Sequence, residues 1–207
     1  MKTTTLPLQN LMNASRSCAF LLILFAFACF VLSPQARATC QQGCDLANGN
    51  TFLGDDTLVN NTTGSENTAI GGGALLSNST GIQNTGVGSG ELLFNTTGEL
   101  NTATGYYALI SNTTGKRNAA DGNAALMNNT TGSDNIALGD EAGRNLTTGD
   151  HNIDIGNRGA VAEASTIRTG RVGTQTATYV AGISGATVTD GIGVVVGADG
   201  HLGTVVS

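Results

Sequence analysis

One spacing dominates the sequence: an asparagine recurs every 17 residues, from Asn50 to Asn152, without interruption. A glycine follows each of these asparagines four residues later, and another glycine precedes all but the first by three residues. The unit is Asn-Thr-Thr-Gly-x-x-Asn-Thr-Ala-Ile-Gly-x-x-Ala-Leu-Leu-x, and seven units fill residues 44 to 162. The asparagines are Asn50, Asn67, Asn84, Asn101, Asn118, Asn135 and Asn152, and the glycines after them are Gly54, Gly71, Gly88, Gly105, Gly122, Gly139 and Gly156. Such a repeat requires a fold of stacked, near-identical units.

The length of the unit selects the kind of stack. A period of 17 residues is too short for a helical pair or a propeller blade, and helices tolerate its glycine and asparagine content poorly. The unit fits one coil of a β-solenoid, with one turn at Asn-Thr-Thr-Gly and a second corner at the glycine after the Ile position. Short strands are expected at Asn-Thr-Ala-Ile and at Ala-Leu-Leu. We therefore predict an all-β fold over 50–162: a parallel β-roll or β-solenoid of seven 17-residue coils, stacked about 4.8 Å apart.

Stacking gives the recurrent asparagines a role. In register, the amide of each asparagine can bond the amides of the coils above and below. The sequence therefore predicts an internal ladder of the seven recurrent asparagines, with the seven glycines after them at turns. A second set of asparagines, the first of each unit, is explained equally well by turn preference or by a ladder. This set is Asn61, Asn78, Asn95, Asn112 and Asn129.

The aliphatic residues bear on assembly. Each coil carries about three large ones, for example Ile70, Leu75 and Leu76, which we expect to supply the buried core. Neighbouring strand residues face opposite sides, so Leu75 and Leu76 cannot both enter one narrow core. One row then fills the coil while the other meets another chain, which predicts an oligomer. The alternative places both residues half-buried at a corner.

The ends of the chain differ from the repeat. Residues 1–38 have a basic start, a 15-residue apolar run at Cys18–Leu32 and a small-x-small site at 36–38, which together predict a cleaved secretory signal peptide. Residues 39–49 are expected to form an N-terminal cap with a disulfide candidate, Cys40 and Cys44, closing a local loop or, alternatively, joining two chains. Residues 163–207 are expected to form a small β-rich cap or neck. Within it, Thr176–Val180 alternates like a strand, and an Asp-Gly near 199 predicts a hairpin.

Charge and reactive side chains exclude several function classes. Removing the three basic residues of the leader leaves six basic residues against 15 acidic ones, which argues against nucleic-acid and anionic-membrane partners. His151 and His201 lie in turn sequence without metal-ligand spacing, and Asp121 and Asp154, at strand positions, are expected at solvent or at a coil end. We therefore expect no catalytic residues, no metal site, no cofactor and no enzyme. The Asn-Thr-Thr sites have the form of glycosylation sequons, but the repeat alone explains them.

Several units share a pentapeptide that resembles a known family. The sequences are Asn67-Thr68-Ala69-Ile70-Gly71, Asn84-Thr85-Gly86-Val87-Gly88, Asn101-Thr102-Ala103-Thr104-Gly105 and Asn135-Ile136-Ala137-Leu138-Gly139. They resemble the YadA-like head repeats of trimeric autotransporter adhesins, over about 50–160. The resemblance implies a left-handed parallel β-roll that forms a homotrimer. The repeats also occur in secreted and phage-fibre-like proteins, where a tail like 177–183 precedes an endosialidase-type chaperone. We expect neither the chaperone nor a membrane anchor within these 207 residues.

These observations predict an exported, non-enzymatic protein. It would be secreted or held at the cell surface, as at a bacterial outer membrane, with no membrane span in the mature chain. It would act as an adhesin head or a structural spacer, with a host-surface, matrix or glycan ligand bound through many weak contacts. A phage-derived tail-fibre segment is the alternative. A solitary solenoid that binds glycan or ice is a further one, although the adjacent threonines Thr62 and Thr63 point apart and so do not suit ice.

Overall fold

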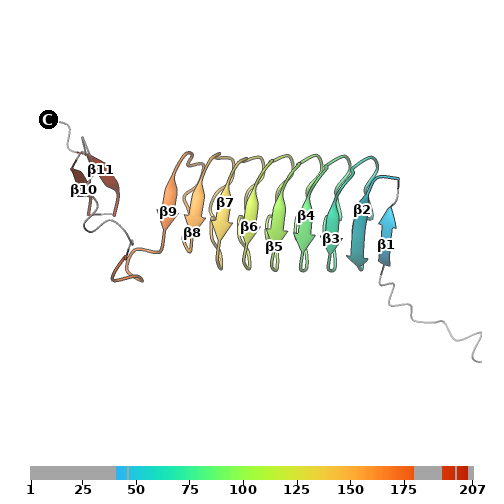
Figure 1. Ribbon diagram of the computed structural model, residues 1–207, viewed down its shortest axis with the longest axis horizontal. Coiled ribbons are helices and arrows are strands. Elements are labelled where there is room, and N and C mark those ends of the chain that lie inside the picture. The colour runs from blue at the N-terminus through green and yellow to red at the C-terminus, as the bar shows by residue number, and fades with distance from the viewer. Residues whose placement is uncertain (1–40, 46, 180–192, 199, 205–207) are drawn as a thin grey trace, which may run out of the picture. The chain divides into compact units, whose positions relative to one another are not determined.

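The computed structural model describes residues 41–45, 47–179, 193–198 and 200–204. The predicted signal peptide and Cys40 lie outside the described residues. The described part of the chain is all-β, and its strands β1 to β9 form one sheet in chain order (Figure 1). The strands of this sheet are β1 (Gln41–Asp45), β2 (Asn50–Gly54), β3 (Thr68–Ile70), β4 (Thr85–Val87), β5 (Thr102–Thr104), β6 (Ala119–Asp121), β7 (Ile136–Leu138), β8 (Ile153–Ile155) and β9 (Ile167–Thr169).

The strand register confirms the predicted parallel β-solenoid. From β2 to β8, each strand pairs in parallel with the next, and paired residues are 17 apart, as in Thr68 with Thr85. The stack continues past the predicted boundary at residue 162, because β9 pairs in parallel with β8 through a shorter coil that joins Ile153 to Ile167. At the other end, β1 pairs antiparallel with β2. The antiparallel strand β1 therefore covers the edge of β2 at which the parallel stack begins.

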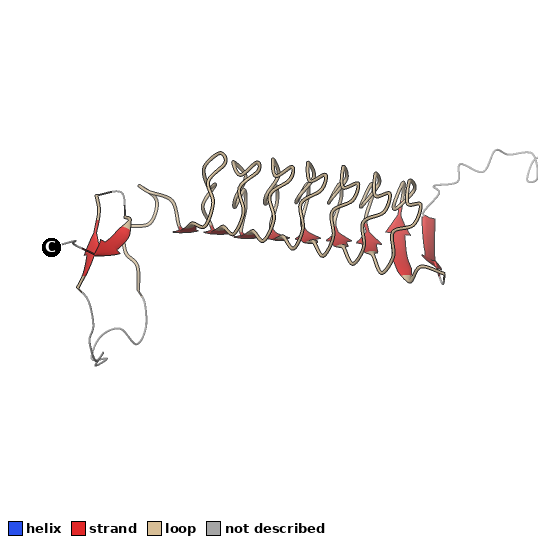
Figure 2. Ribbon diagram, turned by 90° about the horizontal axis from the view of Figure 1, so that it is seen from above, coloured by secondary structure: helices blue, strands red, loops and turns tan. Residues whose placement is uncertain are grey.

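Each coil contributes one strand rather than the predicted two. The segment Ala74–Leu76 is a turn, so the prediction of a strand there is wrong. Leu75 has a φ of 52°, and the leucines stacked on it, Leu92, Leu109 and Leu126, have φ values of 50° or 51°. This left-handed backbone costs roughly 1–2 kcal/mol per residue. The cost is offset because Leu75 N donates to Glu91 O of the next coil at 3.0 Å and the side chain is fully buried. Figure 2 shows the strands along one side of the coils and the turns along the other.

The core of the solenoid is narrow. The middle residue of the strand points inward from β3 to β8, and so do the alanine and the leucine of most turns, so that a typical coil buries two alanines and one leucine, as in Ala103, Ala108 and Leu109. Ile70 was expected in this core but lies 37% exposed on the outer side of the strand, so that expectation is wrong. The first leucine of each Leu-Leu pair fills the coil and Leu76 is half-buried, both within a turn. The pair therefore lies at a corner, as the alternative interpretation placed it, but only its second residue is half-buried. The expected contact of the second row with another chain stays a prediction.

A glycine is required at the corner that follows each strand. Gly71 has a φ of 124°, which side chains rarely adopt, and a Cβ there would overlap the carbonyl oxygen of Gly88 in the next coil. The other predicted turn glycines also have positive φ values. Close backbone stacking and the corner conformation therefore both demand glycine.

The C-terminal residues contain the predicted hairpin. Strands β10 (Val194–Val196) and β11 (Leu202–Thr204) pair antiparallel, and Gly197 N donates to His201 O at 2.8 Å. Thr176–Tyr179, part of the predicted strand Thr176–Val180, is not a strand, and Val180 lies outside the described residues.

Candidate functional site

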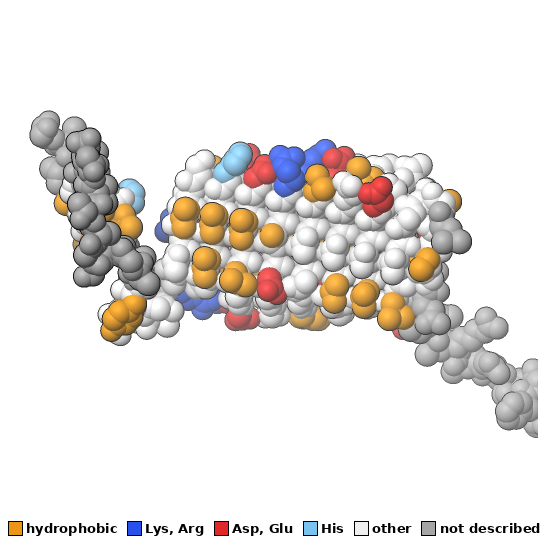
Figure 3. Space-filling model, viewed as in Figure 1, with side chains coloured by type: hydrophobic (Ala, Val, Ile, Leu, Met, Phe, Trp, Pro, Cys, Tyr) orange, Lys and Arg blue, Asp and Glu red, His pale blue; other side chains and the backbone are white. Residues whose placement is uncertain are grey.

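The most distinctive surface of the solenoid is the outer face of its parallel sheet. Because the middle residue of each strand points inward, the first and third residues form two outward columns, and these two columns define the outer face. The first column is Thr51, Thr68, Thr85, Thr102, Ala119, Ile136, Ile153 and Ile167. The third column is Leu53, Ile70, Val87, Thr104, Asp121, Leu138, Ile155 and Thr169. Figure 3 shows rows of apolar side chains along this face.

The outer face exposes large aliphatic side chains. Those of the third column, Leu53 to Ile155, are 37–49% exposed, and Ile136 of the first column is 47% exposed. Parallel sheets usually have both faces covered, because a strand of this kind is apolar on both sides. A contiguous exposed apolar patch marks an interaction site in a soluble protein. The outer face is therefore the candidate functional site.

Polarity changes along the outer face. The first column is threonine in its first four strands and isoleucine in its last three, with Ala119 between. The third column is aliphatic from Leu53 to Val87 and again at Leu138 and Ile155, and it is polar between these stretches, at Thr104 and Asp121, and at its last residue, Thr169. A shallow hollow of about 330 Å³ lies at this polar position, where the side chains are short. It is lined by Thr102, Thr104, Ala119, Ala120, Asp121, Ile136, Ala137 and Leu138. The first column of the outer face thus changes from threonine to isoleucine along the solenoid, and polar residues interrupt the aliphatic run of the third column at one place.

The seven predicted ladder asparagines form one buried column inside the coils. Asn101 is typical of the column: its backbone N and its Nδ2 both donate to Asn84 Oδ1, at 3.0 and 3.1 Å. Its Nδ2 also donates to Gly115 O at 2.8 Å, and its Oδ1 accepts from the backbone N and Nδ2 of Asn118, both at 3.0 Å. The column therefore ties each strand to the next turn and to both neighbouring coils.

The first asparagine of each unit forms a second ladder, which resolves the alternative left open by the sequence. Asn95 Nδ2 donates to Asn78 Oδ1 at 2.9 Å and to Gly98 O at 3.1 Å. The ladder ends at Asn129, whose buried Oδ1 has no partner because Leu146 stands where the next asparagine would donate. The amide nitrogens of these sequons are used inside the rod. The first threonine hydroxyls are used as well, as when Thr96 Oγ1 donates to Thr113 O at 3.0 Å.

One carboxyl group is buried in the core. Glu91 occupies the position that Ala74 and Ala108 fill in the neighbouring coils, its side chain is fully buried, and both carboxyl oxygens are without a hydrogen-bond partner. Gly88, at the corner after β4, leaves room for the carboxyl group, because a Cβ there would overlap Glu91 Oε1. Burial raises the pKa of Glu91 from its ordinary value to about 7.

A second buried carboxyl lies in the strand β8. Asp154 was expected at solvent or at a coil end, but it takes the inward position of its strand and is 1% exposed. Burial and the nearby Glu163 raise its pKa to about 6, against the opposing effect of Arg168. Gly159 makes the space, since a Cβ there would lie 2.8 Å from Asp154 Oδ2. Asp121, in contrast, faces solvent.

Ion pairs run along the turns, away from the outer face. Arg117 Nε and Nη2 donate to the two carboxyl oxygens of Asp134 at 2.6 and 2.8 Å, across neighbouring coils. Arg144 and Arg158 both bond the carboxylate of Glu141. The arginines beside Asp134 and Glu141 hold the pKa of each carboxyl below its usual range.

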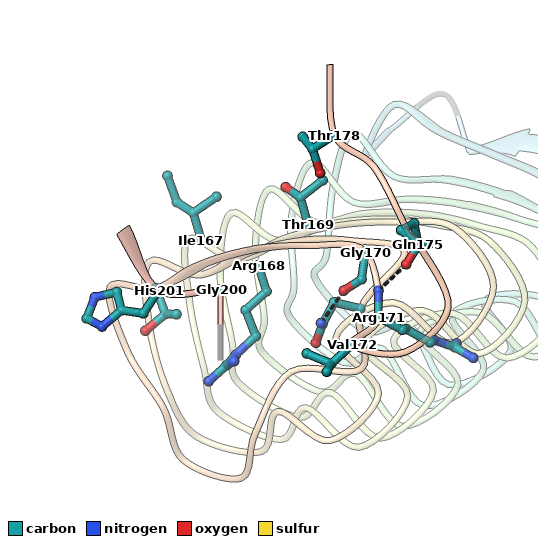
Figure 4. Close-up of a pocket in the computed structure, with 12 residues that line it drawn as sticks. Ile167, Arg168, Thr169, Gly170, Arg171, Val172, Gln175, Thr178, Gly200 and His201 are labelled. Carbon is teal, nitrogen blue, oxygen red and sulfur yellow. Dashed lines mark hydrogen bonds between the residues drawn. The ribbon is translucent and has the colours of Figure 1, made fainter. Parts of the chain in front are cut away.

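A second hollow lies beside the last solenoid strand (Figure 4). Its wall includes Arg168 and Thr169 of β9 and residues that follow the strand. There Arg171 N donates to Gln175 Oε1 at 2.6 Å, and Asn157 Nδ2 donates to Gly170 O at 2.5 Å. These bonds fold the segment after β9 and attach it to the last coil, so this hollow belongs to the end of the stack.

The remaining candidates are scattered. His151 Nε2 lies 3.8 Å from Asp134 on an exposed turn, His201 lies in the hairpin turn, and Cys44 is exposed in β1. Within residues 41–45, 47–179, 193–198 and 200–204, no group of three His, Cys, Asp or Glu side chains is placed to hold a metal ion. In the same part of the chain, no helix is long and apolar enough to cross a membrane. The sequence analysis did not identify the outer face, although the alternation of inward and outward residues along each strand could have revealed it.

No protein-family model matches the chain, and neither a curated protein nor a solved structure matches it.

Proposed function

We propose that this chain is an exported, non-enzymatic surface or fibre protein whose solenoids pack side by side as a homotrimer through the outer face. The single observation that carries the proposal is the row of exposed aliphatic side chains on a parallel sheet, from Leu53 to Ile155. Covering them stabilises an assembly by roughly 25 cal/mol per Å² of apolar surface. A second and third copy of the chain offer a cover of matching length and spacing.

Three copies around one threefold axis all run in the same direction. In such a ring, in register, the first column of each chain faces the third column of the next. Ile136 then lies at the height of Leu138, and Thr102 at the height of Thr104. The two-column width suits three copies, because each chain can then present one column to each of its two neighbours. Three copies also agree with the adhesin head repeats that the sequence resembles.

A role as head or spacer agrees with how the repeat uses its polar groups. Both asparagine ladders and the first threonine hydroxyls bond within the rod. What each coil offers to the outside is its turn edges, repeated at every coil. Such an array binds through many weak contacts, and three copies multiply them.

Assembly is tested by the mass in solution of the protein purified after export, with and without reductant. We expect a trimer in both conditions. Leu138→Glu places a charge on the outer face and should give a folded monomer. Leu100→Glu is the matched control, because Leu100 is 46% exposed, against 49% for Leu138, and lies at a turn. A wild-type monomer, or equal behaviour of the two variants, would contradict the proposed interface.

The adhesion part has its own test. The trimer and the Leu138→Glu monomer are compared for retention on cells, extracellular matrix and a glycan array. Retention of the trimer with loss in the monomer is expected for a multivalent adhesin. If the trimer is retained on none of these surfaces, the adhesin role is wrong and the spacer role remains.

A further inference from the structure

A single carboxylate interrupts the apolar third column of the outer face. Asp121 stands on β6, in the column that has Val87 and Leu138 at its aliphatic positions. Its Oδ1 accepts a hydrogen bond from Thr104 Oγ1 on the neighbouring strand at 2.5 Å. The shallow hollow is centred on this pair, because Ala119 and Thr102 beside it are short. Charge, hydroxyl and hollow therefore coincide at one coil.

Stability alone does not explain a carboxylate at this place. A charge that is covered by another chain loses its water, and the loss exceeds what one hydrogen bond returns. An aliphatic residue, as at the equivalent positions of β4 and β7, would bury apolar surface instead. Single buried polar residues are retained in coiled coils because they fix register and the number of chains.

We propose that Asp121, its hydroxyl partner Thr104 and the hollow around them fix the axial register of the parallel copies. The inference rests on the proposed assembly through the outer face. In register, the hollows of all copies lie at the same height and enclose one pocket. Each carboxylate then keeps its Thr104 partner and has space for water, at the cost of some stability.

A slipped arrangement lacks this pocket. Identical coils would otherwise permit a slip of one coil, about 4.8 Å, because every coil has the same length and strand spacing. After such a slip, Asp121 of one copy lies at the height of Leu138 in its neighbour and loses water without a new partner. A slipped contact also fails to close into a ring and leads to open-ended assemblies. The carboxylate therefore selects the closed, in-register form.

The test compares Asp121→Leu with the wild-type chain. We expect the variant to fold, to dissociate at a higher temperature and to give a distribution of larger species in place of one closed trimer. Asp121→Asn keeps a polar side chain in the hollow and should keep the single species. Asp55→Leu is the control, because it removes an exposed acid that lies in the turn after β2.

Register is measured directly by disulfide cross-linking in chains whose own Cys40 and Cys44 are replaced by serine, so that each exported chain carries one introduced cysteine. A Thr68→Cys chain is mixed either with an Ile70→Cys chain, on the same coil, or with a Val87→Cys chain, on the adjacent coil, and the chains differ in tag length. A disulfide needs Cα atoms within about 4.4–6.8 Å, so yields distinguish same-coil from adjacent-coil neighbours. With Asp121 present, the same-coil mixture should give more cross-linked product than the adjacent-coil mixture. Asp121→Leu should bring the two yields together.

The outcomes separate the two proposals. A wild-type chain that is monomeric overturns the proposed assembly. A wild-type trimer together with an Asp121→Leu variant that remains one closed trimer of unchanged mass overturns the register role alone. Dissociation of the Asp121→Leu variant to monomers, with Asp121→Asn still a trimer, would also overturn it, because the polar side chain would then be required for stability.

Discussion

The inward and outward residues of the same short strands obey different rules. Inward positions are almost uniform: Ala69, Gly86, Ala103, Ala120 and Ala137 follow one another, all buried. Outward positions on the same strands include threonine, alanine, isoleucine, valine, leucine and aspartate. The inside is limited by the opposite wall of the coil, whose buried leucines, such as Leu109, leave these strand positions room for little more than a methyl group. The outside is limited by whatever covers it, so its sequence carries the information about assembly.

The largest expected effect tests the inside at the asparagine ladder. Asn101→Ala leaves the buried backbone N of Asn118 without a partner and removes one of the two donors to the carbonyl of Gly115, which keeps its bond from Asn112 Nδ2. We expect a loss of about 3–5 kcal/mol of unfolding free energy, since each buried polar group left unpaired costs 1–3 kcal/mol. The adjacent Thr102→Ala, on the outer face, should change it little. Denaturant titration measures both, and equal losses would contradict the ladder's role.

The next effect concerns pH and Glu91. Its folded pKa of about 7 lies above its ordinary value of 4.5, so the native state holds the proton more tightly than the unfolded state. The contribution of Glu91 to the free energy of unfolding is fully present below about pH 4.5. It is lost as the pH rises through 7, and the loss is about 3 kcal/mol at most. Glu91→Gln should flatten this decline. Thermal unfolding between pH 4 and 8, at constant protein concentration, measures it, and a wild-type curve that rises over this range would contradict it.

Neighbouring alanines on β6 compare the two sides directly. Ala120 is 2% exposed between Ala103 and Ala137, whereas Ala119 faces outward. Ala120→Leu should lower the unfolding free energy by about 2 kcal/mol through overpacking. Ala119→Leu should leave the solenoid intact and fill the hollow on the outer face. The difference in thermal midpoint between the two variants is the measurement, and equal midpoints would show that the strand does not separate inside from outside as described.

The smallest effect is expected at the turns. Arg117→Ala removes two bonds to Asp134, but both side chains are solvent-accessible. Exposed ion pairs contribute little because water and salt screen them. The thermal midpoint should stay within experimental error, in low and in high salt. A marked drop in the thermal midpoint that depends on salt would show that the ion pairs at the turns stabilise the fold.

Part of this structure could be predicted from the repeat alone. A constant period forces equal coils, so residues 17 apart must stack, and Asn50 to Asn152 must share a column. The same argument put Gly71 and its equivalents at corners. The prediction for Ile70 was wrong because it used hydrophobicity alone. Ile70 faces outward because its neighbour on the strand, Ala69, points into the core. The leucine turns were missed because leucine at a φ near 50° contradicts local preference and is held only by stacking.

The period, the parallel stack and the residues that share each column follow from the repeat, because a fixed repeat length leaves only one way to keep the coils in register. The folded coil sets which column faces inward, which polar groups lose water and which apolar side chains stay uncovered. These properties depend on the path by which the backbone closes each coil. Leu75 and Glu91 enter the core and Ile70 does not because backbone turns, not side-chain chemistry, set their direction.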